Sequence, residues 1–144
     1  MKKIRLLSAA VGSFSVLSAL AQSPPSIVGH WTWTRAKNGC TETYEYRAGG
    51  KLFVVSGTEK TENEYSISLV PNQGGFFAMT ITTTKEESGV DCSNSHAGSM
   101  GKTSTAYVKF SPSGDQHIVC YDSEGKRCYG PLARVPKSAA QPGR

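Results

Sequence analysis

The amino-acid sequence predicts an all-β domain: an antiparallel up-and-down β-barrel of about eight strands, held by two disulfides. Short runs of alternating apolar and polar residues are separated by clusters rich in Gly, Pro, Asn and Ser, a pattern typical of strands and tight turns. No stretch of ten residues repeats its apolar positions with a helical period. Closing the sheet also removes exposed edges, so a barrel is favoured over an open sheet.

Four strands are expected in the first half of the domain. Residues 27–35 place both tryptophans on one face, and residues 40–47 place two tyrosines on one face, because strand side chains repeat every two residues. Residues 51–56 are rich in Phe and Val, and residues 65–70 alternate again after a polar stretch, 61–64, that we interpret as a turn.

Four more strands complete the set. Residues 76–84 are dense in Thr, Phe and Ile, and residues 103–110 alternate strictly. Residues 116–121 follow a turn rich in Ser, Pro and Gly, and residues 128–135 form the last strand. Residues 85–101 have no strand character and are expected to form a long loop. Loops longer than about 12–15 residues are uncommon and are often functional.

The N-terminus has the features of a bacterial secretory signal. Lys2, Lys3 and Arg5 precede an uncharged apolar run that ends in Ala19-Leu20-Ala21, which fits a small-x-small cleavage motif. The run is shorter than the roughly 20 apolar residues of a spanning helix. We expect residues 1–21 to be removed after Ala21, which leaves no stable membrane anchor and a location in the periplasm or outside the cell.

The rest of the chain divides into a linker at residues 22–26, one barrel domain at 27–135 and a disordered tail at 136–144. Without residues 1–21 the chain keeps 13 basic and 11 acidic residues, a net charge of +2. No basic stripe runs through the domain, so we expect no nucleic-acid partner.

The cysteines are expected to form disulfides, because an even number in an exported chain favours them. Cys120 and Cys128 bracket a short polar segment that fits a hairpin turn. Of the three possible pairings we therefore favour Cys120–Cys128, which leaves Cys40–Cys92 to tie the long loop to an early strand. No C-x-x-C or other zinc spacing occurs, and we expect no metal site and no cofactor.

Gly29-His30-Trp31 begins the first expected strand, and Arg134 lies in the last. In these positions the chain resembles the lipocalin-like (calycin) superfamily, and in particular small exported lipocalin-like domains of bacteria. The resemblance implies that Gly29, Trp31 and Arg134 close one end of a barrel, with the guanidinium over the indole, a cation–π contact of about 0.5–2 kcal/mol. It also implies an interior site for a small apolar molecule.

Catalysis is not expected. The sequence has no Gly-x-Ser-x-Gly nucleophile motif and no complete phosphate-binding loop. Its many glutamates, interspersed with Lys and Thr, are interpreted as a solvated strand face. His30 alternates with Trp31 and is expected on the outside, while His96 lies in the long loop.

Two non-catalytic functions are compatible with the sequence. The first is binding of a small apolar or amphipathic molecule inside the barrel. A barrel of eight strands is just wide enough to be filled by side chains or to hold one small ligand, and the short chain favours a mostly filled interior. The second is a periplasmic protein-interaction module, an enzyme inhibitor or immunity-type protein acting through loop 85–101. The aromatic candidates for the core or ligand site are Trp33, Tyr44, Tyr46, Phe53, Phe76 and Tyr107.

Overall fold

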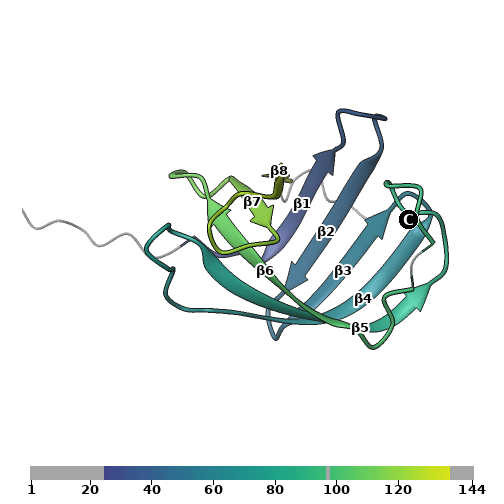
Figure 1. Cartoon of the computed structure of the whole chain (residues 1–144), viewed down its shortest axis with the longest axis horizontal. Coiled ribbons are helices and arrows are strands. Elements are labelled where there is room, and N and C mark those ends of the chain that lie inside the picture. Colours follow the sequence, from purple (N-terminus) through teal and green to yellow (C-terminus); the bar gives the residue numbers. More distant parts are fainter. Residues whose placement is uncertain (1–24, 97, 137–144) are drawn as a thin grey trace, which may run out of the picture.

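The computed structural model describes residues 25–96 and 98–136, and the expected signal peptide, most of the linker and nearly all of the tail lie outside this part of the chain. The predicted fold class is confirmed: the described residues form a closed antiparallel barrel in which each strand pairs with the next and the last pairs with the first. Figure 1 shows strands β1 to β5 side by side, with β6 leading across to β7 and β8. The strands are β1 (Gly29–Thr34), β2 (Thr41–Arg47), β3 (Lys51–Ser56), β4 (Glu59–Ile67), β5 (Phe77–Glu87), β6 (Thr103–Phe110), β7 (Gln116–Cys120) and β8 (Cys128–Arg134).

Two sequence predictions about boundaries are wrong. Residues 61–64 belong to β4 rather than to a turn, and the first three residues of the predicted loop 85–101 belong to β5. Both segments are polar and lack an apolar alternation: Asn63 on β4 is buried, whereas Lys85 and Glu87 on β5 are exposed. Asn63 on β4 accepts a hydrogen bond from the hydroxyl of Thr83 on β5 at 2.9 Å, and backbone pairing satisfies the strands whatever side chains they carry.

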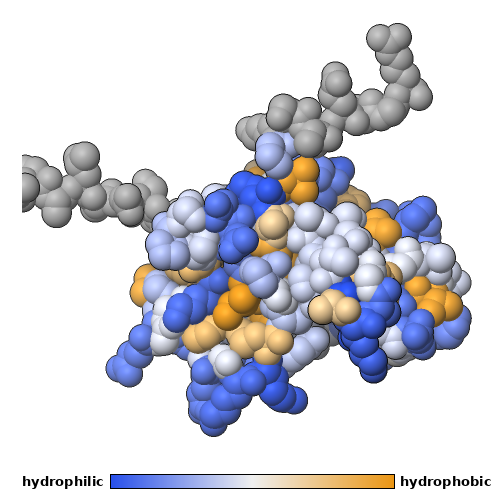
Figure 2. Space-filling view, turned by 90° about the horizontal axis from the view of Figure 1, so that it is seen from above, coloured by the Kyte–Doolittle hydropathy of each residue, from blue (hydrophilic) through white to orange (hydrophobic). Residues whose placement is uncertain are grey.

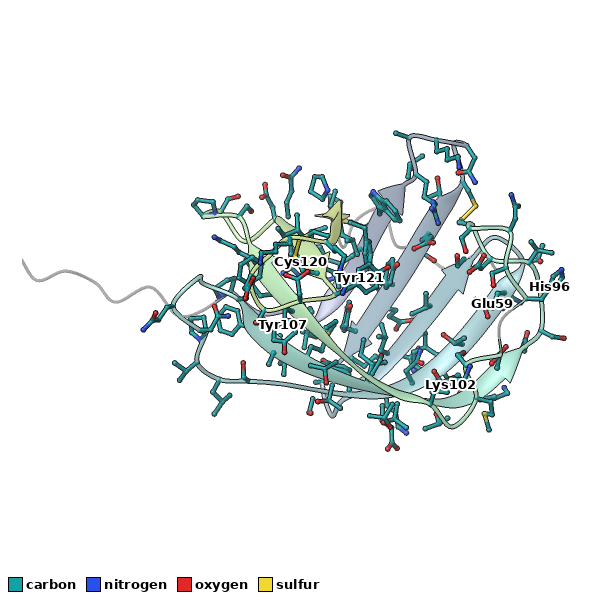
Figure 3. The ribbon with its side chains drawn as sticks, in the orientation of Figure 1. Glu59, His96, Lys102, Tyr107, Cys120 and Tyr121 are labelled. Atoms are coloured by element: carbon teal, nitrogen blue, oxygen red, sulfur yellow. A yellow bond between two sulfur atoms is a disulfide. The ribbon has the colours of Figure 1, made fainter. Side chains whose placement is uncertain are left out.

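Both predicted disulfides are present. Cys120 and Cys128 are directly opposite each other at the ends of β7 and β8. Cys40, in the hairpin between β1 and β2, is bonded to Cys92 in the loop after β5, and Figure 3 draws this bond between the two segments. The long connection after β5 is therefore fixed to the hairpin between β1 and β2.

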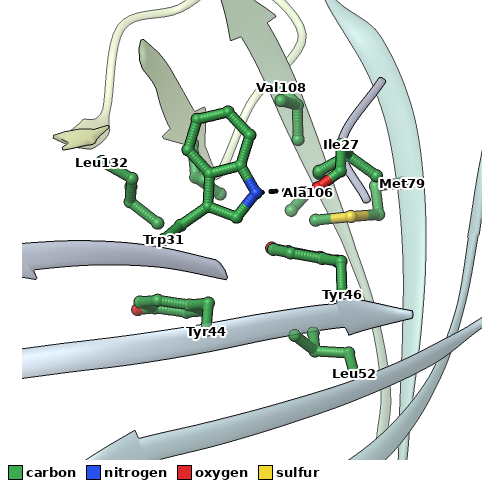
Figure 4. Close-up of a cluster of buried hydrophobic side chains, with 10 residues drawn as sticks. Ile27, Trp31, Tyr44, Tyr46, Leu52, Met79, Ala106, Val108 and Leu132 are labelled. Atoms are coloured by element: carbon green, nitrogen blue, oxygen red, sulfur yellow. Dashed lines mark hydrogen bonds between the residues drawn. The ribbon is translucent and has the colours of Figure 1, made fainter. Parts of the chain in front are cut away.

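One end of the barrel, which we call the floor, is filled with apolar side chains. Figure 4 shows this cluster around Trp31, whose indole nitrogen donates a hydrogen bond to the Ile27 carbonyl at 2.7 Å. Trp31, Met79 and Val108 are fully buried. Burying a large apolar side chain contributes about 1.5–3 kcal/mol, so the floor supplies much of the stability. The buried cluster extends from the floor to the base of the cavity at the other end of the barrel, and it consists of Ile27, Trp31, Tyr44, Tyr46, Leu52, Met79, Ala106, Val108, Val119 and Leu132.

The outside of the barrel is mixed in polarity. Figure 2 shows small separate hydrophobic patches among hydrophilic residues on the face it draws. Leu69, which the alternation of residues 65–70 groups with the inward side chains, instead lies in the loop after β4 and is 90% exposed.

Candidate ligand-binding site

The floor is closed by a contact between the two ends of the domain. The guanidinium carbon of Arg134 lies 4.0 Å from the centre of the Trp31 ring, the contact that the resemblance implies. The same guanidinium donates to the Val28 and Ser26 carbonyls at 2.8 and 2.6 Å. A Cβ at Gly29 would lie 2.8 Å from the Arg134 nitrogen, and the φ angle of Gly29 is +138°, so a side chain at this position would be strained.

The opposite end of the barrel, the mouth, is hollow. A cavity of about 570 Å³ is lined by inward-facing residues of β1, β2, β5, β6, β7 and β8 and by the loops at that end. Small-molecule sites commonly measure about 300–1,000 Å³. The expectation of a mostly filled interior therefore holds for the floor and is wrong for the mouth. The lining residues are Trp33, Arg35, Glu42, Tyr44, Ile81, Asp91, Ser93, Ser104, Thr105, Ala106, Val119, Tyr121 and Tyr129.

Aromatic side chains form one wall of the mouth. The rings of Trp33 and Tyr129 have centres 5.1 Å apart, and those of Tyr129 and Tyr121 are 5.9 Å apart. Such separations are typical of favourable ring contacts. Tyr121 is largely exposed at the rim, while Tyr44 is buried. The wall therefore runs from the solvent into the interior.

The structure separates the six aromatic candidates. Trp33 and Tyr44 line the mouth, and Tyr46 lies in the buried cluster of the floor. The other three do not lie on the inner face of the barrel, although Phe76 is itself buried. Phe53 packs under the Arg47 guanidinium at 4.2 Å, and Phe76 lies below Lys109 and against Gly125. Tyr107 alternates with the inward Ala106 and Val108. Strand alternation separates Tyr107 from the inward set, but the sequence does not show which face of β3 is the inner one.

The loop between β5 and β6 forms part of the mouth. The backbone nitrogen of Thr58 donates to the Val90 carbonyl at 2.9 Å, and the backbone nitrogen of Val90 donates to the Thr58 hydroxyl at 2.9 Å. The Cys40–Cys92 disulfide fixes the centre of the loop. These bonds hold Asp91 at the cavity wall.

A buried carboxylate lies in the wall of the cavity. Glu42 is 9% exposed and lies on the same inward face of β2 as Tyr44. Its two oxygens accept hydrogen bonds from the Ser56 hydroxyl at 2.9 Å and from the Tyr44 hydroxyl. The interpretation of the glutamates as a solvated face is wrong for Glu42. The signal was in the sequence, because Glu42 alternates in phase with Tyr44 and Tyr46.

The electrostatic environment of the mouth is negative. Burial, reinforced by the charges of Glu86, Asp91 and Glu42, raises the pKa of Glu59 above its usual value. Burial, together with neighbouring Tyr129 and Glu42, raises the pKa of Tyr44, so its hydroxyl remains a donor at neutral pH. Figure 3 places Glu59 at the same end of the barrel as Lys102.

Two carboxylates, Glu86 at the end of β5 and Asp91 in the loop, accept hydrogen bonds from residues of the loop. Glu86 accepts hydrogen bonds from the backbone nitrogens of Ser99 and Met100 at 2.6 and 2.9 Å, and these bonds, those from Ser99 foremost, lower its pKa. Burial acts to raise the pKa of Asp91, but hydrogen bonds from Ser95 and Ser93 outweigh it, and the pKa is lowered. Both carboxylates are therefore ionised at neutral pH.

The three histidines lie apart from one another. His30 and His96 are exposed, and His117 is buried in the floor against Trp31. In the described part of the chain, no group of three or more His, Cys, Asp and Glu side chains is placed to hold a metal ion. Residues 25–96 and 98–136 also include no helix with the length and apolar character needed to cross a membrane.

The fold and the cavity together define a class: an eight-stranded up-and-down barrel with a filled floor and a hollow mouth of ligand size, consistent with a lipocalin-like fold. The chain matches no model of a protein family, and neither the search of curated proteins nor the search of solved structures found a match.

Proposed function

We propose that this protein is an exported, non-catalytic binding protein that holds one small apolar or amphipathic molecule in the mouth of its barrel. The observation that carries the proposal is the cavity of about 570 Å³ in the barrel interior. A packed interior would have no room for a ligand, whereas apolar cavities with a few convergent polar groups are typical binding sites.

The lining supports an amphipathic ligand. Trp33, Ile81 and Val119 offer apolar surface, and Glu42 and Ser104 offer polar groups. The filled floor and the two disulfides support the same role, since they hold the walls in place before binding. A preformed site loses less conformational entropy when its ligand binds.

The test is to place a large side chain in the cavity and to measure whether a ligand still binds. Ser104 faces the mouth, whereas its neighbour Thr103 faces outward and contacts the Thr82 hydroxyl. We expect the wild-type protein to bind the neutral dye Nile red with one site per chain, measured by fluorescence titration. Ser104→Trp should weaken binding by about tenfold or more, because the indole would occupy part of the cavity that the dye needs. Thr103→Trp is the matched control and should bind as the wild type does. No uptake of the dye, or equal uptake by both variants, contradicts the proposal.

A second candidate function is recognition of an exported protein through the loop after β5. It is favoured by the way the loop is held: a disulfide and a strand-end carboxylate fix it, and Met100 is left 61% exposed. A loop that is ordered before binding is suited to recognition. Pull-down from periplasmic extract should lose a protein partner with Met100→Glu and retain it with the Leu69→Glu control. Equal recovery by the two variants counts against the loop.

A further inference from the structure

The mouth contains a charge that the protein itself does not neutralise. Glu42 is nine-tenths buried, and within residues 25–96 and 98–136 its oxygens accept hydrogen bonds only from the hydroxyls of Tyr44 and Ser56. Among the described residues, no Lys, Arg or His side chain forms an ion pair with it. Removing a carboxylate from water is costly unless a cation compensates it, so the site has an unfilled requirement for positive charge.

The hydrogen bonds around Glu42 leave room for one more donor. An ionised carboxylate has about four acceptor positions, and the two hydroxyls occupy two of them. Ser56 is itself held in place, because its oxygen accepts from the backbone nitrogen of Cys92 at 3.0 Å. Because Glu42 lines the cavity, its remaining acceptor positions are available to a donor group of a bound ligand.

The cation in the cavity lining is Arg35, and its guanidinium interacts with groups other than Glu42. Arg35 lies with its guanidinium carbon 5.7 Å from the centre of the Trp33 ring. The positive charge of Arg35 also contributes to lowering the pKa of Asp91, the second carboxylate of the lining. The cavity lining thus carries two carboxylates, Glu42 and Asp91, and one cation, Arg35, so one negative charge is in excess.

The aromatic wall suits the same kind of ligand. The faces of Trp and Tyr rings attract cations, and they do so more strongly where water is excluded. Trp33, Tyr129 and Tyr44 all line the cavity that Glu42 lines. The Glu42 carboxylate disfavours an anionic head group, because like charges repel in a partly dry site.

We propose that the cavity selects a cationic amphipathic molecule, an organic amine with an apolar body, and that Glu42 is the counter-ion of its ammonium group. This inference rests on the proposed binding function and specifies its ligand class. The ammonium donates to the carboxylate, and the apolar body lies against Trp33, Ile81 and Val119.

The test uses three probes of one shape: 4-phenylbutylamine, 4-phenyl-1-butanol and 4-phenylbutyrate. Each is titrated into the full mature protein at pH 7, with binding followed by calorimetry and by amide shifts in NMR spectra. In the wild-type protein we expect the amine to bind about tenfold more tightly than the alcohol, as a charge-assisted hydrogen bond allows. The acid should bind most weakly.

Glu42→Gln should bring the amine and the alcohol to equal affinity while the alcohol keeps its wild-type affinity. Glu45→Gln is the matched control, because Glu45 lies on the outer face of the same strand, bonded to Arg47, and it should keep the full preference. The preference of the wild-type protein needs no variant, so a poorly folded Glu42→Gln protein does not block the test.

The outcomes separate the two levels of the argument. Binding of the alcohol or the acid as tight as that of the amine overturns the ligand class and leaves the binding function standing. If the Glu42→Gln protein still binds the amine more tightly than the alcohol, the role of Glu42 is overturned. Failure of all three probes to bind or to shift cavity amides overturns the binding function and the inference together.

Discussion

Because of the buried His117, we expect the free energy of unfolding of the barrel to fall as the pH is lowered from 7 to 5. The His117 side chain is 1% exposed, and its ring centre lies 4.2 Å from that of Trp31 and 5.6 Å from that of Phe110. In the described part of the chain neither ring nitrogen has a hydrogen-bond partner. Burial, with a further contribution from the positive charge of Arg134, lowers the pKa of His117 from 6.5 to about 3.

The sign and size of the effect follow from proton linkage. Below pH 6.5 the unfolded chain binds a proton at His117 and the folded chain does not, so the free energy of unfolding falls as the pH falls. The contribution is fully present above pH 6.5 and is lost progressively as the pH approaches 3. Each pH unit in this window removes about 1.4 kcal/mol, so lowering the pH from 7 to 5 should remove about 2 kcal/mol.

Urea unfolding at pH 7, 6 and 5 measures this directly. His117→Leu removes the titrating ring at comparable volume and should lose the extra dependence on pH. His30→Gln, a change at an exposed histidine on β1, should retain it. The raised pKa of Glu59 acts with the opposite sign at lower pH, and comparing the variants cancels it. The same slope in wild type and His117→Leu would refute the assignment.

Three further changes test the closure of the barrel. Arg134→Met removes the guanidinium from the Trp31 ring together with its hydrogen bonds to backbone carbonyls, and should lower the free energy of unfolding by about 2–4 kcal/mol in urea. An unchanged midpoint would contradict this. Gly29→Ala places a Cβ 2.8 Å from Arg134 at a φ of +138°; it should cost about 1–3 kcal/mol, and a neutral result would show that the backbone relaxes. Replacing Cys40 and Cys92 together with Ser should cost about 4 kcal/mol and speed hydrogen exchange in the loop, whereas protection equal to wild type would mean that its hydrogen bonds suffice.

The alternation of residues was enough to predict most of the barrel. Where one face is apolar and the other polar, as in residues 103–110, the strand was predicted with its observed bounds. The disulfide partners were predicted because Cys120 and Cys128 flank a turn. Residues 61–64 failed the same test, since both faces of that part of β4 are polar and the strand carries no apolar signal.

The candidate site was only partly accessible from the sequence. Trp33 and Tyr44 were among the aromatic candidates, but the same criterion also selected Phe53 and Phe76, which do not lie on the inner face of the barrel. Glu42 was grouped with the other glutamates, because composition does not distinguish a charge that faces water from one that faces a cavity.

The sequence by itself determined the class of fold, the order of the strands and the Cys120–Cys128 pairing, because alternation and turn chemistry are local properties of neighbouring residues. The Cys40–Cys92 pairing then followed by elimination. Only the tertiary structure decided that the floor is filled and the mouth is hollow. That difference depends on the distance between side chains from opposite walls, such as Trp33 and Ile81, which the curvature of the closed sheet sets and no local pattern encodes.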